Sequence, residues 1–374
     1  MKAKPKGLYV HIPFCQSKCN YCDFCSFPNI DEDIRARYIS KLISEIKSYK
    51  QKEKLIIDTV FFGGGTPSLL SEEEFGSICG AISECFDVSL VKEFTLEANP
   101  KTLTQEKLFA YKSFGVNRLS IGLQSIHNNE LKMLGRIHNF DDFKTAYELA
   151  LSCGIININV DVMYGIPEQT KDSFMQTLDA VVKLKPTHIS AYGLILEEKT
   201  KFWDIQKTLN LPSEDAECDM YEFACEYLEK NGYAHYEISN YAIGGYESNH
   251  NLKYWKCEEY IGIGVAAHSY VDGKRYSNSE NFSEYLSRKS REYIYEENRS
   301  HSDEKCEYAM LRLRLSSGIS LSEYEKIFGE SFLLGKEKKL EQYISLGYMR
   351  RFDDRIALTE KGFYISNTIL SDLI

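Results

Sequence analysis

Three cysteines near the start of the chain, Cys15, Cys19 and Cys22, have a spacing that could hold a metal cluster. Thiolates are the usual ligands of iron–sulfur clusters, and closely spaced cysteines let one loop contact three corners of a cubic cluster. Three protein ligands also leave one iron open to a small molecule. Structural zinc sites, the main alternative, generally pair two Cys-x-x-Cys elements, and no second one follows here. A thiol-redox site would need only two of these cysteines. We therefore predict a [4Fe–4S] cluster on these three residues.

Other polar and glycine residues stand where short apolar segments end. They are the Gly-Gly-Gly-Thr-Pro run at 63–67, then Glu97, Gln124 and Asp161. In barrel enzymes the reactive face is formed by the C-terminal ends of the strands. We therefore expect these residues and the cysteine loop to meet at one rim.

The elements that must position this rim alternate regularly between residues 7 and 196. Strands are predicted at 8–12, 59–62, 93–97, 118–123, 156–163 and 188–194, and helices at 32–50, 71–84, 104–113, 139–152 and 170–184. Ser71 and Glu74 form a capping-box pattern that supports a helix start at that point. Six consecutive strand–helix units predict an α/β fold, a partial (β/α)6 TIM-like barrel. An open, doubly wound sheet is the alternative.

The pattern changes after residue 197. A predicted helix at 213–230 leads into a tract rich in glycine and tyrosine, and helices from about 300 precede two short strands around Asp353 and Asp354. This order predicts a smaller α+β, winged-helix-like C-terminal domain. We accordingly divide the chain into a core barrel (1–232), a segment that caps the barrel (233–295) and a C-terminal domain (296–374).

The composition limits the partners that the protein can have. The 374 residues include 45 basic and 55 acidic ones, a net charge of −10. This balance argues against nucleic acid, because phosphate binding relies on clustered Lys and Arg. No apolar run approaches the ~18 residues that a membrane span needs, and no secretory signal is recognisable. We expect a cytoplasmic protein that is not an integral membrane protein, with peripheral membrane contact left open.

The stretch from Tyr9 to Phe24, Tyr-Val-His-Ile-Pro-Phe-Cys-Gln-Ser-Lys-Cys-Asn-Tyr-Cys-Asp-Phe, resembles the opening of the radical S-adenosylmethionine (SAM) family. It is similar to the coproporphyrinogen-dehydrogenase-like branch, and the similarity continues to residues 358–362. The resemblance implies a cluster on the cysteine loop, an electron donor for it, and SAM on the open iron. It also implies that SAM contacts Tyr9, Tyr21, Gly64, Gly65, Thr66, Glu97, Gln124, Arg136 and Asp161. A guanidinium such as that of Arg136 matches a carboxylate.

Two subgroups of this branch compete for the chain. Oxygen-independent coproporphyrinogen III dehydrogenases, which decarboxylate their substrate to protoporphyrinogen IX, typically carry a fourth cysteine two residues after the third. Phe24 occupies that position here, and Cys25 stands one residue late. Those enzymes also have a longer segment before the first strand than the eight residues that precede Tyr9. Both departures argue against decarboxylation.

The second subgroup comprises the HemW-type haem chaperones, which the chain resembles at residues 250–255 (His-Asn-Leu-Lys-Tyr-Trp). The resemblance implies that haem contacts His250, Asn251, Tyr254 and Trp255, and that haem passes to acceptor proteins. Imidazole can bind haem iron, so His250 is the preferred ligand, with His268 and Cys257 as rivals. An aromatic-rich strand end that serves only packing is the alternative. A haem-degrading radical methyltransferase is a third function to consider. The residues leave open whether SAM is consumed.

Overall fold

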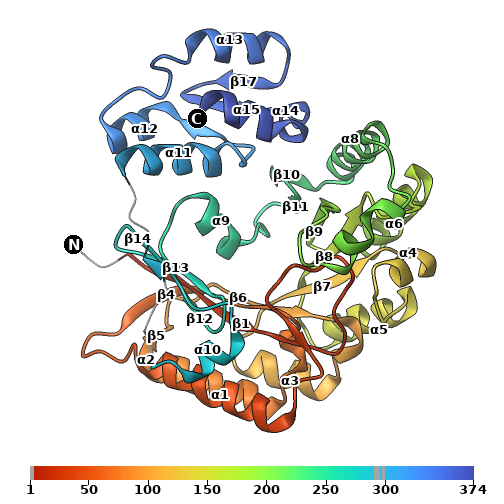
Figure 1. Ribbon diagram of the computed structural model, residues 1–374, viewed down its shortest axis with the longest axis vertical. Coiled ribbons are helices and arrows are strands. Elements are labelled where there is room, and N and C mark those ends of the chain that lie inside the picture. The colour runs from red at the N-terminus through yellow and green to blue at the C-terminus, as the bar shows by residue number, and fades with distance from the viewer. Residues whose placement is uncertain (1–3, 290–294, 297–299) are drawn as a thin grey trace.

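One large twisted sheet organises the chain in this computed structural model, which describes residues 4–289, 295–296 and 300–374 (Figure 1). Six parallel strands form its centre and lie side by side in sequence order. They are β1 (Lys6–Ile12), β4 (Leu55–Gly64), β6 (Glu93–Ala98), β7 (Arg118–Gln124), β8 (Asn157–Tyr164) and β9 (His188–Gly193). All six strands predicted from the sequence are confirmed.

The strand order distinguishes between the two architectures that the sequence left open. A doubly wound sheet reverses its order beside the first strand. Here β1, β4, β6, β7, β8 and β9 advance in one direction, as in a barrel. Within the described residues the sheet does not close, because its order ends at β10 (Ala234–Glu237) on one side and β15 (Tyr295–Glu296) on the other. The partial (β/α)6 barrel is confirmed.

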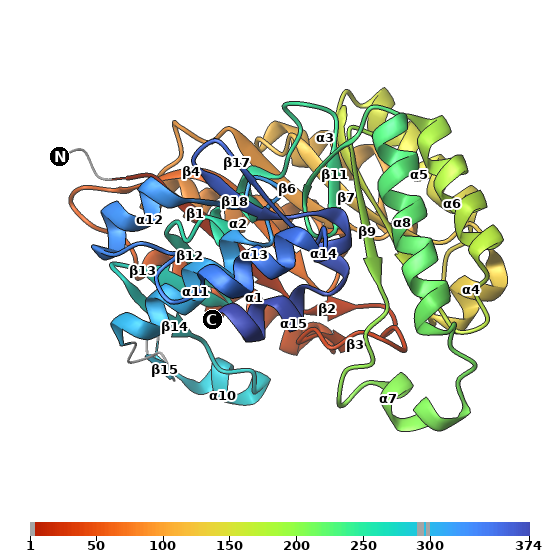
Figure 2. The same ribbon diagram turned by 90° about the horizontal axis from the view of Figure 1, so that it is seen from above.

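Helices cover the outer face of the curved sheet (Figure 1). The segments that follow successive strands form α1 (Glu32–Lys47), α2 (Glu72–Cys85), α3 (Gln105–Ser113), α4 (Asn128–Met133), α5 (Phe140–Ser152), α6 (Lys171–Leu184) and α8 (Glu214–Lys230). Figure 2 shows α6 and α8 side by side near β9. The predicted capping box at Ser71 and Glu74 is present at the start of α2, where it satisfies amide groups of the first turn.

The segment after the barrel extends the same sheet at both ends. On the β9 side, β10 and β11 (Asn240–Ala242) add antiparallel strands. On the other side, β12 (Tyr260–Ile263) pairs parallel with β1, and β13 (His268–Val271), β14 (Lys274–Ser277) and β15 follow antiparallel. The helix α10 (Phe282–Ser287) then packs against α1.

Residues 250–255 differ from the strand end considered above. They belong to a short helix, α9 (Asn249–Trp255), which connects the two ends of the sheet. The Ser248 side chain accepts the amide of Asn251, and the carboxylate of Glu93 accepts the amides of Asn249 and His250. Ser248 is a local N-cap signal, but Glu93 comes from a distant strand, so the local sequence shows only part of what stabilises this helix.

A smaller domain follows and lies on the α9 side of the barrel (Figure 1). Its three antiparallel strands have the order β16–β18–β17. The elements are α11 (His301–Arg312), β16 (Ile319–Ser320), α12 (Leu321–Phe328), α13 (Glu337–Ser345), β17 (Met349–Phe352), β18 (Arg355–Leu358), α14 (Glu360–Tyr364) and α15 (Ser366–Leu373). The predicted winged-helix-like α+β unit is confirmed. No helix of the described segments is long and apolar enough to cross a membrane.

Candidate functional site

The cysteine loop is closed and anchored by backbone contacts. The two-residue strands β2 (Phe14–Cys15) and β3 (Phe27–Pro28) pair at its base. Between the second and third cysteines, Asn20 donates its amide N–H to Leu134 O at 3.0 Å and its side-chain Nδ2 to Met133 O at 2.7 Å. Its own carbonyl accepts the amide of Phe202 at 2.8 Å, at α7 (Lys201–Ile205). The loop is therefore held by the segments that follow β7 and β9, whose Leu134 and Phe202 belong to one apolar cluster.

The three cysteines border one cavity of about 330 Å³ at the C-terminal ends of the strands. Each thiol is half-buried and free. In the part of the chain that the structure describes, no three His, Cys, Asp or Glu side chains converge closely enough to hold a single metal ion. A cubic cluster does not require such convergence, because each thiolate binds a different iron. The donor set therefore fits an iron–sulfur cluster better than a mononuclear zinc ion.

The loop at residues 63–67 packs directly against the cysteine loop. Gly65 N–H donates to Ile12 O, and Thr66 N–H donates to Phe14 O, both at 2.8 Å. A Cβ at Gly65 would lie 2.7 Å from Phe14 O and 3.0 Å from Cys15 Sγ. Only glycine permits this approach of the two backbones. A side chain at position 65 would therefore disturb the cluster loop as well as any ligand beside it.

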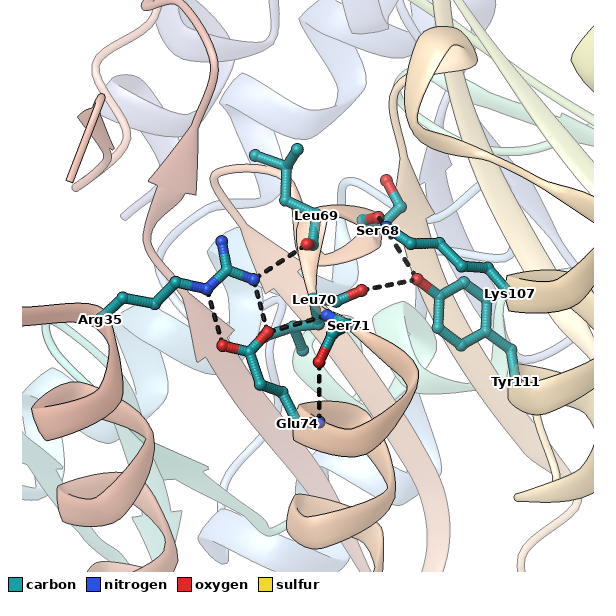
Figure 3. A network of polar contacts seen from close by, with 8 residues as sticks. All are labelled: Arg35, Ser68, Leu69, Leu70, Ser71, Glu74, Lys107 and Tyr111. Carbon is teal, nitrogen blue, oxygen red and sulfur yellow. Dashed lines mark hydrogen bonds and ion pairs between the residues drawn. The ribbon is translucent and has the colours of Figure 1, made fainter. Parts of the chain in front are cut away.

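Arg35 of α1 contacts the turn and the helix that follow the loop at residues 63–67 (Figure 3). Its Nε donates to Glu74 Oε1 at 2.7 Å, and its Nη2 donates to Leu69 O at 2.9 Å, in the turn η1 (Pro67–Leu69). Its guanidinium also stands 4.8 Å from the ring centroid of Phe14, beside Cys15. A charged, bidentate contact of this kind fixes geometry more tightly than a single neutral hydrogen bond. Arg35 thus connects the cysteine loop to the residues that follow Thr66.

Two carboxylates face the cavity from β6 and β8, the strands on either side of β7. Glu97 Oε2 accepts the amide of Gly64 at 3.1 Å, and Asp161 Oδ1 accepts Asn159 Nδ2 at 2.7 Å. Burial, together with the charge of Asp161, raises the pKa of Glu97 to about 8. Burial also raises the pKa of Asp161. Protonated or partnered carboxyl groups in a cavity are suited to hydrogen-bond the hydroxyl groups of a ligand.

Arg136 supplies a positive charge beside the second cysteine. Its Nη1 donates to Cys19 Sγ at 3.5 Å and its Nη2 to Gly122 O at 2.8 Å. Its buried Nε has no hydrogen-bond partner among the described residues. A buried donor without a partner costs free energy, so an anionic ligand here would be stabilised. The cavity therefore fits a small molecule that carries a carboxylate.

Gln124 ends β7 in a strained conformation. Its backbone has φ +73°, in the left-handed region that side chains rarely adopt. Its side-chain oxygen accepts the hydroxyl of Tyr192 at 2.8 Å, at the end of β9. Strain of this kind persists only where the surroundings enforce it, and it is frequent at ligand sites.

The structure brings nearly all of the predicted cluster and SAM residues to this cavity. Its lining includes Cys15, Cys19, Tyr21, Cys22, Gly64, Gly65, Thr66, Glu97, Gln124, Arg136 and Asp161. Tyr9 instead borders an adjoining cavity of about 820 Å³, which shares Gly64 and Glu97 with the first. This larger cavity reaches α9, where His250, Asn251 and Tyr254 line it. Trp255 lines neither cavity and packs against the guanidinium of Arg314.

His250 is fully buried, and both of its ring nitrogens are engaged. Nδ1 hydrogen-bonds to Thr59 Oγ1 at 2.9 Å, and Nε2 hydrogen-bonds to the hydroxyl of Tyr254 at 2.8 Å. Its ring stacks on Phe61 with centroids 5.2 Å apart. Burial, with the charges of Lys253 and Arg118, lowers the pKa of His250 to about 3, so the ring is neutral.

Sequence reasoning missed several residues that border the two cavities. Ser120 and Gly122 share the inner face of β7 with Gln124, and Tyr192 ends β9. The two-residue period of a strand, counted back from Gln124, would have found the first two. His11, which borders the larger cavity, was also missed, because no local pattern marked it. His268 borders the same cavity, and the sequence had named it as a rival iron ligand.

Residues 9–181 match the Radical SAM superfamily, and residues 300–365 match the HemN C-terminal domain. Heme chaperone HemW of Lactococcus lactis is 38% identical over 377 residues, covering 100% of this chain and 98% of that protein. Heme chaperone HemW of Escherichia coli is 34% identical, covering 99% and 98%. This chain belongs to the HemW family of radical SAM proteins.

Membership of the HemW family implies a [4Fe–4S] cluster and SAM, which the rim cavity fits in its donors and charge. Among solved structures, coproporphyrinogen III oxidase (HemN) of Escherichia coli superimposes with a TM-score of 0.86 and 21% identity. The match covers 99% of this chain and 90% of that enzyme. At this identity the likeness shows the shared fold alone.

Proposed function

We propose that this protein binds haem in the larger cavity and passes it to acceptor proteins. The observation that carries the proposal is the cavity itself. It has a volume of about 820 Å³, within the range of small-molecule sites, and it adjoins the rim cavity of the cysteines. Support comes from the HemW relatives, which are named heme chaperones and match along the whole chain.

For the cofactors, we assign the cluster to Cys15, Cys19 and Cys22. Bound together, cluster and SAM supply one-electron chemistry, with electrons from an external donor. Arg136 would pair with the carboxylate of SAM, because its buried Nε lacks a partner. Glu97 and Asp161 would hydrogen-bond ribose hydroxyls, and Gly64 to Thr66 would hold the methionine end. Tyr21 and Gln124 complete the wall of this cavity.

For haem, we assign the wall of the larger cavity that α9 forms. Asn251 and Tyr254 present an amide and an aromatic ring there. Tyr9 of β1 and Phe61 of β4 add aromatic rings to the lining of the same cavity. Aromatic faces stack well on a flat macrocycle. Lys18 and Lys199 at the edge are suited to its propionate groups. Ligation of iron by His250 stays a prediction, and it would require the loss of a hydrogen bond to Thr59 or Tyr254.

Decarboxylation of coproporphyrinogen III is the alternative that we consider weaker. Phe24 stands where the decarboxylating subgroup typically has its fourth cysteine, and its side chain is 59% exposed at the shared edge of the two cavities. An exposed phenyl ring cannot ligate iron or transfer a proton. We therefore expect no conversion by this chain.

One anaerobic experiment separates the two functions. Protein with a reconstituted cluster is titrated with haem, and in parallel it is incubated with coproporphyrinogen III, SAM and a reductant. The proposal predicts saturable binding of one haem per chain and transfer of that haem to an apo-acceptor protein. It also predicts no protoporphyrinogen IX by mass spectrometry. Product that depends on SAM and reductant, without saturable haem binding, would reverse the assignment.

We further propose that the protein works in the cytoplasm, where a reducing environment keeps its 11 cysteines as thiols. We retain the division into 1–232, 233–295 and 296–374 as a functional proposal. The large sheet runs through the first two of these segments, so they are expected to fold together. Limited proteolysis with and without haem would test the division. Bound haem is expected to slow cleavage within residues 233–295.

A further inference from the structure

Three histidines border the larger cavity, and their ring nitrogens differ in availability. His11 hydrogen-bonds through Nδ1 to Tyr9 OH at 3.0 Å and through Nε2 to Cys25 O at 2.8 Å. His250 uses both nitrogens on Thr59 and Tyr254. His268 is exposed to the cavity and has no hydrogen bond from its ring within the described residues. Binding of a metal through His11 or His250 would first break a buried hydrogen bond, and binding through His268 would not.

The backbone that carries His268 is held closely. His268 opens β13, directly after a turn from β12. A Cβ at Gly262 would lie 2.0 Å from His268 O, so glycine at this position lets the two strands approach. The amide of Gly262 donates to Ser269 Oγ at 2.9 Å, and Asn278 N–H donates to Ala267 O at 2.9 Å. The residues on both sides of His268 are therefore fixed, although its ring is free. Because the backbone is already fixed, only the side chain of His268 loses freedom when it binds a ligand.

The position of His268 also suits a flat macrocycle. The same cavity is bordered by Tyr254 of α9, by Tyr9 of β1 and by Cys25 of the cysteine loop. Cys25 Sγ contacts Glu280 O at 3.5 Å, and Glu280 borders the cavity beside His268. An iron ligand on β13 would thus leave the ring of the macrocycle free to stack on the aromatic residues of β1 and α9.

We propose that His268 binds the haem iron in the larger cavity, and that His250 instead positions Tyr254 and helix α9. The inference rests on the proposed haem-binding function. It replaces His250 as the preferred ligand, because imidazole needs a free nitrogen lone pair to bind iron. His250 fixes the wall of the cavity through its bonds to Thr59 and Tyr254.

The test uses the full chain with its cluster, titrated anaerobically with ferric haem. The variants are His268→Ala, His268→Gln, His250→Ala and Cys25→Ser, each followed by haem absorbance, electron paramagnetic resonance and thermal melting. Both His268 variants are expected to shift the haem spectrum and to weaken binding at least tenfold, with a wild-type melting temperature. Added imidazole should restore the wild-type spectrum in His268→Ala. His250→Ala should lower the melting temperature and leave the spectrum of the bound haem unchanged.

The outcomes separate this inference from the proposed function. A wild-type spectrum and affinity in both His268 variants would overturn the assignment, as would a spectral change in His250→Ala or Cys25→Ser alone. If the unmodified protein shows no saturable haem binding, the proposed function itself fails, whatever the variants do. If the melting temperature falls in His268→Ala but not in His268→Gln, the haem spectrum of His268→Gln decides whether His268 is the ligand.

Discussion

The carboxylate of Glu93 accepts the backbone N–H of His250 at 3.0 Å, across 157 positions of the chain. The same buried carboxylate accepts Asn249 N–H at 2.8 Å and the hydroxyl of Ser248 at 3.4 Å. Glu93, the first residue of β6, thereby accepts hydrogen bonds from the free amides at the start of α9. A negative charge is also favourable there, because the N-terminus of a helix carries a partial positive charge. The wall of the larger cavity depends on this contact.

Replacement of Glu93 by Ala should therefore destabilise the protein and weaken haem binding. Buried amides left without an acceptor cost about 1–3 kcal/mol each, so a loss of about 2–4 kcal/mol of unfolding free energy is expected. Glu93→Gln, which keeps one acceptor oxygen, should lose less. Melting curves and haem titration measure both effects. Glu73→Ala, in the exposed first turn of α2, is the matched control and should behave as wild type.

The cluster assignment predicts different results for neighbouring cysteines. Alanine at position 15, 19 or 22 should abolish the [4Fe–4S] cluster, because each thiolate would bind its own iron. Cys25→Ala should keep the full cluster, since Cys25 stands outside the three-cysteine spacing and contacts Glu280. Iron and sulfide analysis with absorbance after anaerobic reconstitution gives the answer. A full cluster in Cys19→Ala, or none in Cys25→Ala, would contradict the assignment.

Arg35 offers a test of the SAM site from outside the cavity. Arg35→Ala removes its contacts with Glu74, Leu69 and Phe14, and so should loosen the loop at residues 63–67. We expect SAM affinity to fall about tenfold, equivalent to about 1.4 kcal/mol, with cluster content retained. Arg37→Ala, an exposed position on the same helix, is the control. Calorimetry measures the affinity, and equal SAM binding in both variants would show that Arg35 has no influence on the site.

The elements that shape the rim could be predicted because their signals are local. Apolar runs that end in glycine or polar residues marked the strands, and Ser71 and Glu74 marked a helix start. The spacing of the cysteines likewise lies within one loop. Sequence reasoning did not find α9, because apart from the N-cap residue Ser248 the contacts that stabilise it come from Glu93 and Thr59 on distant strands. Nor could it find the pairing of β12 with β1, which joins residues 7–10 to 260–263.

The predicted haem element, residues 250–255, shows the same limit of prediction from local sequence. Its residue types fit both a ligand and a packing role, and the resemblance alone made His250 the preferred ligand. The structure adds that both ring nitrogens of His250 are hydrogen-bonded, to Thr59 and to Tyr254. The sequence named His268 only as a rival ligand, and the three-dimensional arrangement is what places it at the larger cavity.

Glu97 should make the stability of the protein depend on pH near neutrality. Burial and the neighbouring charge of Asp161 raise its pKa to about 8, whereas a glutamate in the unfolded chain has a pKa of about 4.3. Between these two values the folded state holds a proton that the unfolded state releases. The folded state therefore loses stability as pH rises through this window, by up to about 1.4 kcal/mol per pH unit.

Glu97→Gln removes this titration and keeps a group of the same shape at Gly64. Urea unfolding of wild type and variant, without added SAM, is compared at several values between pH 5 and 8. The wild type should lose stability relative to Glu97→Gln as pH rises, by on the order of 1 kcal/mol per pH unit. Asp161, whose pKa is also raised, is present in both proteins, so much of its effect cancels in the comparison. Parallel stability curves over the whole range would mean that Glu97 is already ionised in the folded protein, and that the proposed contact with SAM would involve a fully charged carboxylate.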